Sequence, residues 1–143
     1  MSANGTDWPQ GYVHVYTGDG KGKTTAALGL VLRAAGAGLP VYIGQFMKNG
    51  GTSEIEALQR CAEQVTIEPY GTPSFLHMRA APDPDDVRRA EEGYRKAADA
   101  LASERFRVVV LDEIVCAVHF ELLTTEAVLE LLRARPDAVE LVL

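Results

Sequence analysis

Residues 17–25 read Thr-Gly-Asp-Gly-Lys-Gly-Lys-Thr-Thr and stand between an apolar run, Tyr12–Tyr16, and a segment with helical spacing, Ala26–Leu32. Glycines let several backbone N–H groups converge on one anion, and the N-terminus of the following helix adds a positive field. A lysine at the end of such a turn supplies further charge, and the triplet Gly22–Thr24 places one there. The stretch therefore predicts a phosphate-binding loop, with a nucleoside triphosphate as its ligand.

The loop departs in two places from the strict pattern G-x-x-x-x-G-K-[ST]. Thr17 occupies the position of the first glycine, with Gly18 supplying the flexibility one residue later, and Lys21 adds a second cation. The alternative is a flexible basic turn without a ligand, but the Gly-Lys-Thr ending between a strand and a helix favours the phosphate loop. The residues expected to contact the nucleotide are Gly18, Asp19, Gly20, Lys21, Gly22, Lys23, Thr24 and Thr25.

Composition and charge narrow the class of protein. A chain of 143 residues with 47% hydrophobic residues fits one domain, expected over residues 11–143, after a disordered leader over residues 1–10. The net charge of -6 argues against nucleic acid or an anionic membrane as a partner. Cys61 and Cys116 are too few for a disulfide framework and are expected to be buried free thiols. Because the sequence also shows neither an apolar run of roughly 20 residues nor a signal peptide, we expect a cytoplasmic protein.

Apolar runs alternate with segments of helical spacing along the chain. Val108–Leu111 is uninterrupted and apolar, which is typical of a central parallel strand covered on both faces. Ser53 and Asp83 have side chains suited to capping the helices that follow them. We expect strands over residues 12–16, 41–46, 65–70, 108–111 and 139–143, and helices over about residues 24–35, 53–62, 84–103 and 126–134.

This alternation predicts an α/β, three-layer, P-loop NTPase-like fold with a mainly parallel sheet and right-handed crossovers. Ligands of such sheets bind beyond the carboxyl ends of the strands. Four segments follow strand ends and are expected to line one crevice: the phosphate loop, Gln45–Lys48, Tyr70–Phe75 and Asp112–Glu113. Because the chain stops at Leu143 inside an apolar strand, we expect the sheet to be truncated at the C-terminus.

Asp112 and Glu113 place two carboxylates at the end of a buried strand. A carboxylate beside a phosphate loop can hold Mg²⁺ directly or through water, with the Thr24 hydroxyl as the partner ligand. The residues alone leave two reactions open. In a small ATPase or kinase the γ-phosphorus is attacked, and Glu113 orients a water. Alternatively, a reactive co-substrate attacks the 5′ carbon of the ribose and the triphosphate leaves, which requires positioning and charge stabilisation.

Three segments carry a recognisable pattern: residues 17–27 (TGDGKGKTTAA), residues 44–48 and residues 109–114, and residues 123–136 follow with matching order and spacing. Together they resemble the ATP:corrinoid adenosyltransferases that act on cob(I)alamin and cob(I)yrinic acid diamide. The resemblance implies an enzyme that transfers the 5′-deoxyadenosyl group of ATP to the Co(I) of a reduced corrinoid and releases triphosphate, in adenosylcobalamin synthesis or salvage. Co(I) would be the nucleophile, so the protein needs none of its own. A non-catalytic ATP- and corrinoid-binding chaperone is the remaining alternative.

The resemblance also implies how ATP is held. Lys21 and Lys23 would neutralise the triphosphate, and they are the expected catalytic residues of the loop. Thr24 and Glu113 would hold Mg²⁺, with Asp112 beside them. The predicted ligands are therefore ATP as co-substrate, Mg²⁺ and a corrinoid substrate.

A further implied role concerns the corrinoid. In the family, aromatic side chains after the third strand press on the lower face of the corrin and help cobalt to become four-coordinate, which makes Co(II) easier to reduce. Phe75 is the catalytic candidate for that position here, and Tyr70 is a weaker one. An electron donor and a homodimer are the further partners that the resemblance implies.

Overall fold

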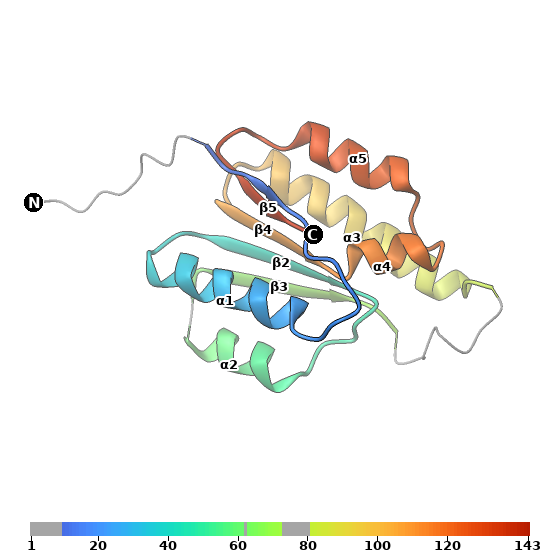
Figure 1. The fold of residues 1–143 in the computed structure, drawn as a ribbon, viewed down its shortest axis with the longest axis horizontal. Coiled ribbons are helices and arrows are strands. Elements are labelled where there is room, and N and C mark those ends of the chain that lie inside the picture. Colours follow the sequence, from blue (N-terminus) through green and yellow to red (C-terminus); the bar gives the residue numbers. More distant parts are fainter. Residues whose placement is uncertain (1–9, 62, 73–80) are drawn as a thin grey trace, which may run out of the picture.

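The structure, a computed structural model, describes residues 10–61, 63–72 and 81–143. These residues form a five-stranded, all-parallel sheet in the order β1-β5-β4-β2-β3, with helices on both faces (Figure 1). The strands are β1 (Val13–His14), β2 (Val41–Phe46), β3 (Val65–Tyr70), β4 (Val108–Asp112) and β5 (Glu140–Val142). The helices are α1 (Lys23–Gly36), α2 (Ser53–Cys61), α3 (Pro84–Ala102), α4 (Ile114–His119) and α5 (Thr125–Ala134).

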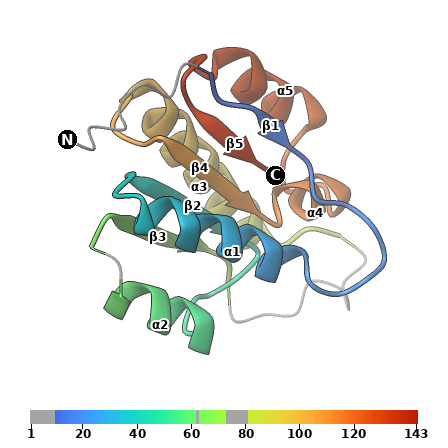
Figure 2. The ribbon, with the colours of Figure 1, turned by 60° about the vertical axis from the view of Figure 1, so that its left-hand side comes forward.

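The sheet separates two hydrophobic cores, because successive side chains of a strand point to opposite faces. On β4, Val108 and Val110 join the core under α1 and α2, whereas Val109 and Leu111 join the core under α3, α4 and α5 (Figure 2). All four side chains are buried, as the uninterrupted apolar run predicted. The three-layer α/β arrangement expected from the sequence is therefore confirmed.

The predicted element boundaries hold closely, and the differences have local causes. β2 and β3 have the expected bounds, and Asp83 caps α3, since its carboxylate accepts a hydrogen bond from the Asp85 N–H at 2.9 Å. The expectation that Ser53 caps α2 is wrong by one residue: the Thr52 carbonyl accepts the first helical hydrogen bonds, so Ser53 already lies inside the helix. Helix α4 was not expected, because its residues continue the apolar pattern of β4.

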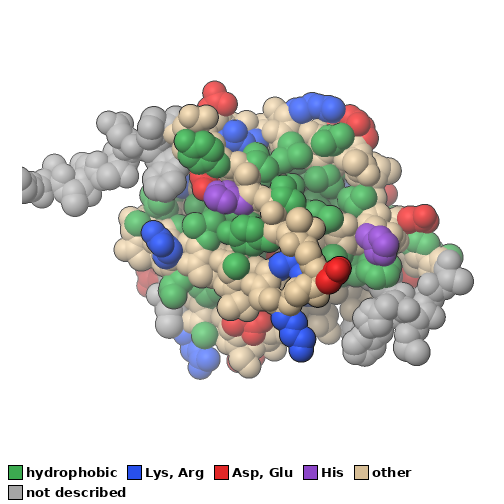
Figure 3. Space-filling model, in the orientation of Figure 1, with side chains coloured by type: hydrophobic (Ala, Val, Ile, Leu, Met, Phe, Trp, Pro, Cys, Tyr) green, Lys and Arg blue, Asp and Glu red, His purple; other side chains and the backbone are tan. Residues whose placement is uncertain are grey.

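Strand β1 forms one edge of the sheet and is less enclosed than the central strands. Only Val13 and His14 have strand geometry, but backbone hydrogen bonds to β5 and Leu143 continue from Tyr12 to Tyr16, the expected range. Tyr12, Val13 and Val15 are exposed, and hydrophobic side chains gather over β1 and β5 in the space-filling view (Figure 3). Among the described helices, none is both long and apolar enough to cross a membrane. The phosphate loop therefore follows an edge strand, β1, that other elements cover only in part.

Candidate nucleotide site

The phosphate loop has the backbone that its glycines predict. Gly18 and Gly22 have φ of 129° and 110°, in the region that side chains with a Cβ rarely adopt. Gly22 is the N-cap of α1, and its carbonyl accepts from the Ala26 N–H at 2.8 Å. The first turn of α1 carries no acidic residue that would compete for its N–H groups and positive field. An anion is therefore the ligand that this helix end favours.

Lys23 folds back over the loop from the first position of α1. Its ammonium donates hydrogen bonds to the carbonyls of Gly18 and Gly20, both at 2.6 Å. A lysine has three N–H donors, so one remains for a ligand while two hold the loop. Asp19, Lys21 and Thr25 are exposed around it. The loop therefore presents two cations: the Lys23 ammonium, which is hydrogen-bonded to the loop backbone, and the exposed Lys21 ammonium.

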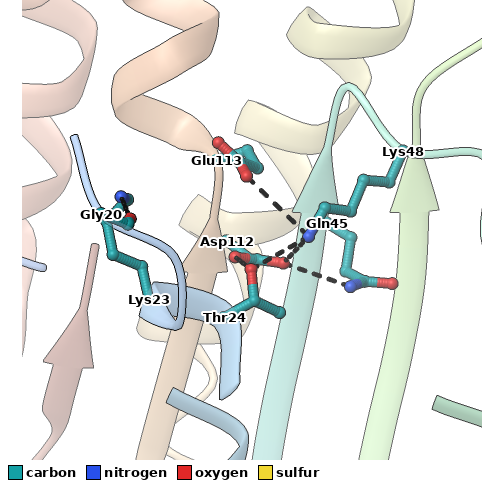
Figure 4. A network of polar contacts seen from close by, with 7 residues as sticks. All are labelled: Gly20, Lys23, Thr24, Gln45, Lys48, Asp112 and Glu113. Atoms are coloured by element: carbon teal, nitrogen blue, oxygen red, sulfur yellow. Dashed lines mark hydrogen bonds and ion pairs between the residues drawn. The ribbon is translucent and has the colours of Figure 1, made fainter. Parts of the chain in front are cut away.

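The second part of the site is a polar cluster at the carboxyl ends of β2 and β4 (Figure 4). Thr24 donates from its hydroxyl to Asp112 Oδ1 at 3.0 Å. Lys48 Nζ lies 2.6 Å from Asp112 Oδ2, 3.1 Å from the Thr24 hydroxyl and 4.0 Å from Glu113 Oε1. Gln45 donates from its amide to Asp112 Oδ2 at 3.2 Å. Asp112 thus joins the first turn of α1 to the end of β2.

Backbone geometry explains why these side chains converge. Gln45 and Asp112 are register partners on neighbouring strands. The residue after each strand, Met47 on one side and Glu113 on the other, has a positive φ of 58° and 64°. A positive φ destabilises a residue other than glycine by about 1–2 kcal/mol, so the surrounding structure must hold Met47 and Glu113 in this conformation. The two strand ends therefore turn sharply enough to direct the following residues back over the sheet.

Glu113 and Cys116 line a cavity of about 130 Å³ between the phosphate loop and β4, together with Gly18, Lys23 and Leu143. Burial raises the pKa of the Cys116 thiol to about 11, and a hydrogen bond to the Glu113 carboxylate contributes in the same direction. Cys116 is a free, partly buried thiol, as expected for it, whereas the side chain of Cys61 is outside the described residues. A second cavity of about 400 Å³ opens on the outer side of the loop beside Lys21 and Lys23.

Three of the four segments expected to line the crevice come together: the phosphate loop, Gln45–Lys48 and Asp112–Glu113. The start of the fourth segment lies beside Gln45–Lys48, since the Tyr70 carbonyl accepts a hydrogen bond from the Met47 N–H at 3.3 Å, but the Tyr70 side chain does not line the crevice. Its hydroxyl is hydrogen-bonded to the Glu68 carboxylate and to the Tyr42 hydroxyl, and its ring lies against Gly93. Burial and Glu68 raise the pKa of Tyr70, which keeps the phenol neutral. The weaker expectation for Tyr70 as a corrin contact is therefore wrong, and Phe75 lies outside the described residues.

The oxygen donors around Asp112 suit a magnesium ion that arrives with a nucleotide. Within the described part of the chain, no three His, Cys, Asp or Glu side chains gather as a metal-binding group. Mg²⁺ commonly takes one or two carboxylates together with substrate phosphates, rather than a cage made wholly of protein. Thr24, Asp112 and Glu113 supply a hydroxyl and two carboxylates of that kind. The residues therefore fit Mg²⁺ bound jointly with a triphosphate.

Sequence reasoning placed Gln45 and Lys48 at a strand end but gave neither a role. Both contact Asp112, because β2 is the immediate neighbour of β4 in the sheet. Strand order is not readable from one sequence, so a lysine after one strand cannot be paired with an aspartate on another. The signal that was available is the polar Gln45 in an otherwise apolar run, since a buried amide requires a partner.

The sequence is similar to known proteins along most of its length. Residues 9–143 match the family described as ATP:corrinoid adenosyltransferase BtuR/CobO/CobP. The chain is 34% identical to the corrinoid adenosyltransferase of Pseudomonas aeruginosa, in an alignment covering 89% of this chain and 62% of that protein. For the corrinoid adenosyltransferase of Escherichia coli K12 the identity is 33%, over 89% of this chain and 63% of the relative. An uncharacterised protein of Nostoc sp. is 33% identical over 92% of this chain and 37% of its own length. The chain thus spans less than two thirds of each of these relatives.

Proposed function

Because the chain belongs to the ATP:corrinoid adenosyltransferase family, we propose that it transfers the 5′-deoxyadenosyl group of ATP to the Co(I) of a reduced corrinoid. The product is an adenosylated corrinoid, made in adenosylcobalamin synthesis or salvage, and triphosphate is released. The observation that carries the proposal is the meeting of the phosphate loop with Asp112, through the Thr24 hydroxyl at 3.0 Å. In the proposed reaction the loop would hold the three phosphates as the leaving group, and the ribose 5′ methylene would be the carbon that reacts.

In the proposed reaction, the electron pair of Co(I) forms a bond to C5′ while the bond from C5′ to the α-phosphate oxygen breaks. The leaving triphosphate carries the negative charge away, so catalysis consists of positioning and charge stabilisation. Residues Gly18 to Thr25 would bind the phosphates through backbone N–H groups and the Thr25 hydroxyl. Lys21 and Lys23 would contribute ammonium charge as the triphosphate departs. The positive end of α1 supports the same role.

We also propose Mg²⁺ as a ligand, held by Thr24 and Glu113, with Asp112 beside them. When bound, the ion would neutralise part of the charge on the triphosphate. Asp112 would orient the Thr24 hydroxyl, since it already accepts a hydrogen bond from it. Calorimetry of ATP binding tests this assignment: Glu113→Gln should weaken binding in the presence of Mg²⁺ and have a much smaller effect in its absence.

Phe75 remains our candidate for the corrin contact, as a residue outside the described part of the chain. An aromatic ring on the lower face would displace the axial ligand and make Co(II) easier to reduce by an external electron donor. Phe75→Ala should then leave ATP affinity unchanged and lower the rate of adenosylation from cob(II)alamin with a reductant. Equal rates for the variant and the wild type would remove Phe75 from the mechanism.

We propose a cytoplasmic setting for the protein. A free Cys116 thiol suits the reducing cytoplasm, where thiols remain unpaired. A homodimer follows from the family resemblance, and light scattering at several concentrations tests it. We propose neither a nucleic acid nor a membrane partner, in keeping with the net charge of -6.

The test of the main proposal is a product assay. The protein is incubated with ATP, Mg²⁺ and chemically reduced cobalamin, and absorbance is followed for a new cobalt–carbon bond. We expect adenosylcobalamin and triphosphate in equal amounts, and neither with the Lys23→Ala variant. Release of ADP and phosphate without alkylation would instead indicate an ATPase or kinase. Binding of both ligands without turnover would indicate a chaperone.

A further inference from the structure

Lys48 occupies the centre of the polar cluster at the ends of β2 and β4. Its ammonium lies 2.6 Å from Asp112 Oδ2, 3.1 Å from the Thr24 hydroxyl and 4.0 Å from Glu113 Oε1 (Figure 4). All three of these side chains offer hard oxygen donors beside the phosphate loop. No other lysine or arginine in the described part of the chain is ion-paired to Asp112 or Glu113.

The position of Lys48 is fixed by its backbone. Met47, immediately before it, has a positive φ of 58°. Gly71 lies so close that a Cβ built on it would stand 2.4 Å from the Lys48 nitrogen, so the two segments are in direct backbone contact. The Lys48 side chain is 28% exposed and that of Asp112 is 9% exposed. Lys48 is therefore a partly enclosed cation aimed at Asp112, unlike a solvated surface lysine.

We infer that Lys48 competes with a divalent cation for the Asp112–Thr24–Glu113 oxygens, and that triphosphate resolves the competition by drawing the ammonium onto itself. This inference rests on the proposed function, because it takes the nucleotide to be a triphosphate that binds with a metal ion. Two positive charges cannot share a site this small in a partly buried setting, where Coulomb repulsion is weakly screened. Lys48 must move before a metal ion can use Asp112 Oδ2.

The chemistry of lysine makes such an exchange feasible. Its ammonium is a compact charge with three donors on a flexible four-carbon stem, so it can leave one anion for another nearby. A triphosphate bound by the loop would offer that second anion. Metal and nucleotide would then bind cooperatively, because each removes a cost of binding the other, and the coupling acts equally in both directions. Lys48 is thus a positioning residue that makes metal binding conditional on nucleotide.

The test measures metal affinity directly, with Mn²⁺ as a paramagnetic probe and electron paramagnetic resonance to count free ions. The wild type is compared with Lys48→Met, which removes the charge, and with Lys48→Arg, which keeps it. Lys96→Met, on the exposed surface of α3, is the control for net charge. Without nucleotide, we expect Lys48→Met to bind Mn²⁺ at least tenfold more tightly than the wild type. Lys48→Arg and Lys96→Met should stay within about threefold of it.

With a non-reactive ATP analogue, Mn²⁺ affinity should rise by a larger factor in the wild type than in Lys48→Met. Mn²⁺ affinity that is unchanged or weaker in Lys48→Met would overturn the inference, and so would an equal effect of Lys96→Met. If Lys48→Met fails to fold by circular dichroism, Lys48→Gln replaces it, because its amide can still donate to Asp112 without a charge.

Failure of the inference and failure of the proposed function give different results. If the wild type alkylates cobalamin but Lys48→Met binds Mn²⁺ no better, the enzyme stands and the competition does not. If Lys48→Met binds Mn²⁺ more tightly but the wild type alkylates nothing, the cation exchange stands on a nucleotide site with another reaction.

Discussion

The nucleotide site has two halves, the phosphate loop and the polar cluster around Asp112, and they differ in how firmly the fold holds them. The phosphate loop follows β1, an edge strand with exposed Tyr12, Val13 and Val15, and its residues 17–22 are all exposed. The polar cluster follows β2 and β4, whose side chains are almost all buried and whose register sets Gln45 opposite Asp112. The central half is therefore fixed by the fold, whereas the loop half relies on glycine conformations and one lysine. We expect a ligand to reorganise the loop, whereas in the centre only the Lys48 side chain moves and the backbone of the strand ends stays in place.

The largest expected effect is on the loop half. Lys23→Ala removes an ammonium that can form charge-assisted hydrogen bonds to phosphate, each of about 1.5–3 kcal/mol. We expect ATP affinity, measured by calorimetry, to fall by about 100- to 1,000-fold, or roughly 3–4 kcal/mol. The free energy of unfolding should change by less than about 0.5 kcal/mol, because Lys23 bonds only to exposed loop carbonyls. Unchanged ATP affinity would show that the loop does not hold the phosphates.

Gly71→Ala tests the half of the site that holds the polar cluster, where we expect backbone contacts to determine stability. A Cβ at this position would stand 2.4 Å from the Lys48 nitrogen and 2.5 Å from the Met47 carbonyl carbon, so the strand ends must separate. We expect the free energy of unfolding, from urea titration, to fall by about 2–3 kcal/mol. Gly29→Ala is the control: a Cβ there meets nothing within 4 Å and lies in α1, so it should be neutral or stabilise by up to about 1 kcal/mol. Equal stability of the two variants would mean that the centre is not fixed.

The difference between the halves also marks what the sequence could predict. The backbone of the loop could be predicted, because local residues specify it: glycines at positive φ, with a lysine and a threonine within a few positions. The strands could be predicted because each coincides with an apolar run, and β2 and β3 have the expected bounds. Asp112 was readable as the end of a buried run.

The contacts between residues of neighbouring strands in the polar cluster could not be predicted from the sequence. Lys48 meets Asp112 across 64 residues of sequence, and no local pattern states that β2 and β4 are neighbours. Tyr70 was misjudged for the same reason, since its burial depends on Gly93 of α3 and on Tyr42 of β2. Helix α4 was missed because an apolar stretch after a strand carries no periodicity of its own.

A smaller effect should come from Gln45, which supports Asp112 from a position that is 2% exposed. Gln45→Leu keeps a similar volume but removes the amide that donates to Asp112 Oδ2 at 3.2 Å. We expect the free energy of unfolding to fall by about 1–2 kcal/mol, because the carboxylate loses one of its partners in a partly buried setting. Gln59→Leu, on the exposed face of α2, should change it by less than about 0.5 kcal/mol. Equal effects would indicate that Asp112 gains nothing from the amide.

The smallest effect concerns Cys116, at the seam between the halves, where it lines a cavity with Lys23 and Glu113. Its thiol pKa is raised from 9.0 to about 11, chiefly by burial, so the folded protein keeps this proton when the unfolded chain has lost it. The stabilisation is complete below about pH 9 and is lost as the pH rises towards 11. For a fully buried thiol this difference in pKa would be worth about 2.7 kcal/mol, and the partial exposure of Cys116 reduces it to about 1 kcal/mol. The free energies of unfolding of the wild type and Cys116→Ser should therefore converge over that range, by urea titration at several pH values. A difference that is constant with pH would mean that water reaches the thiol and that the seam between the loop and the centre is open.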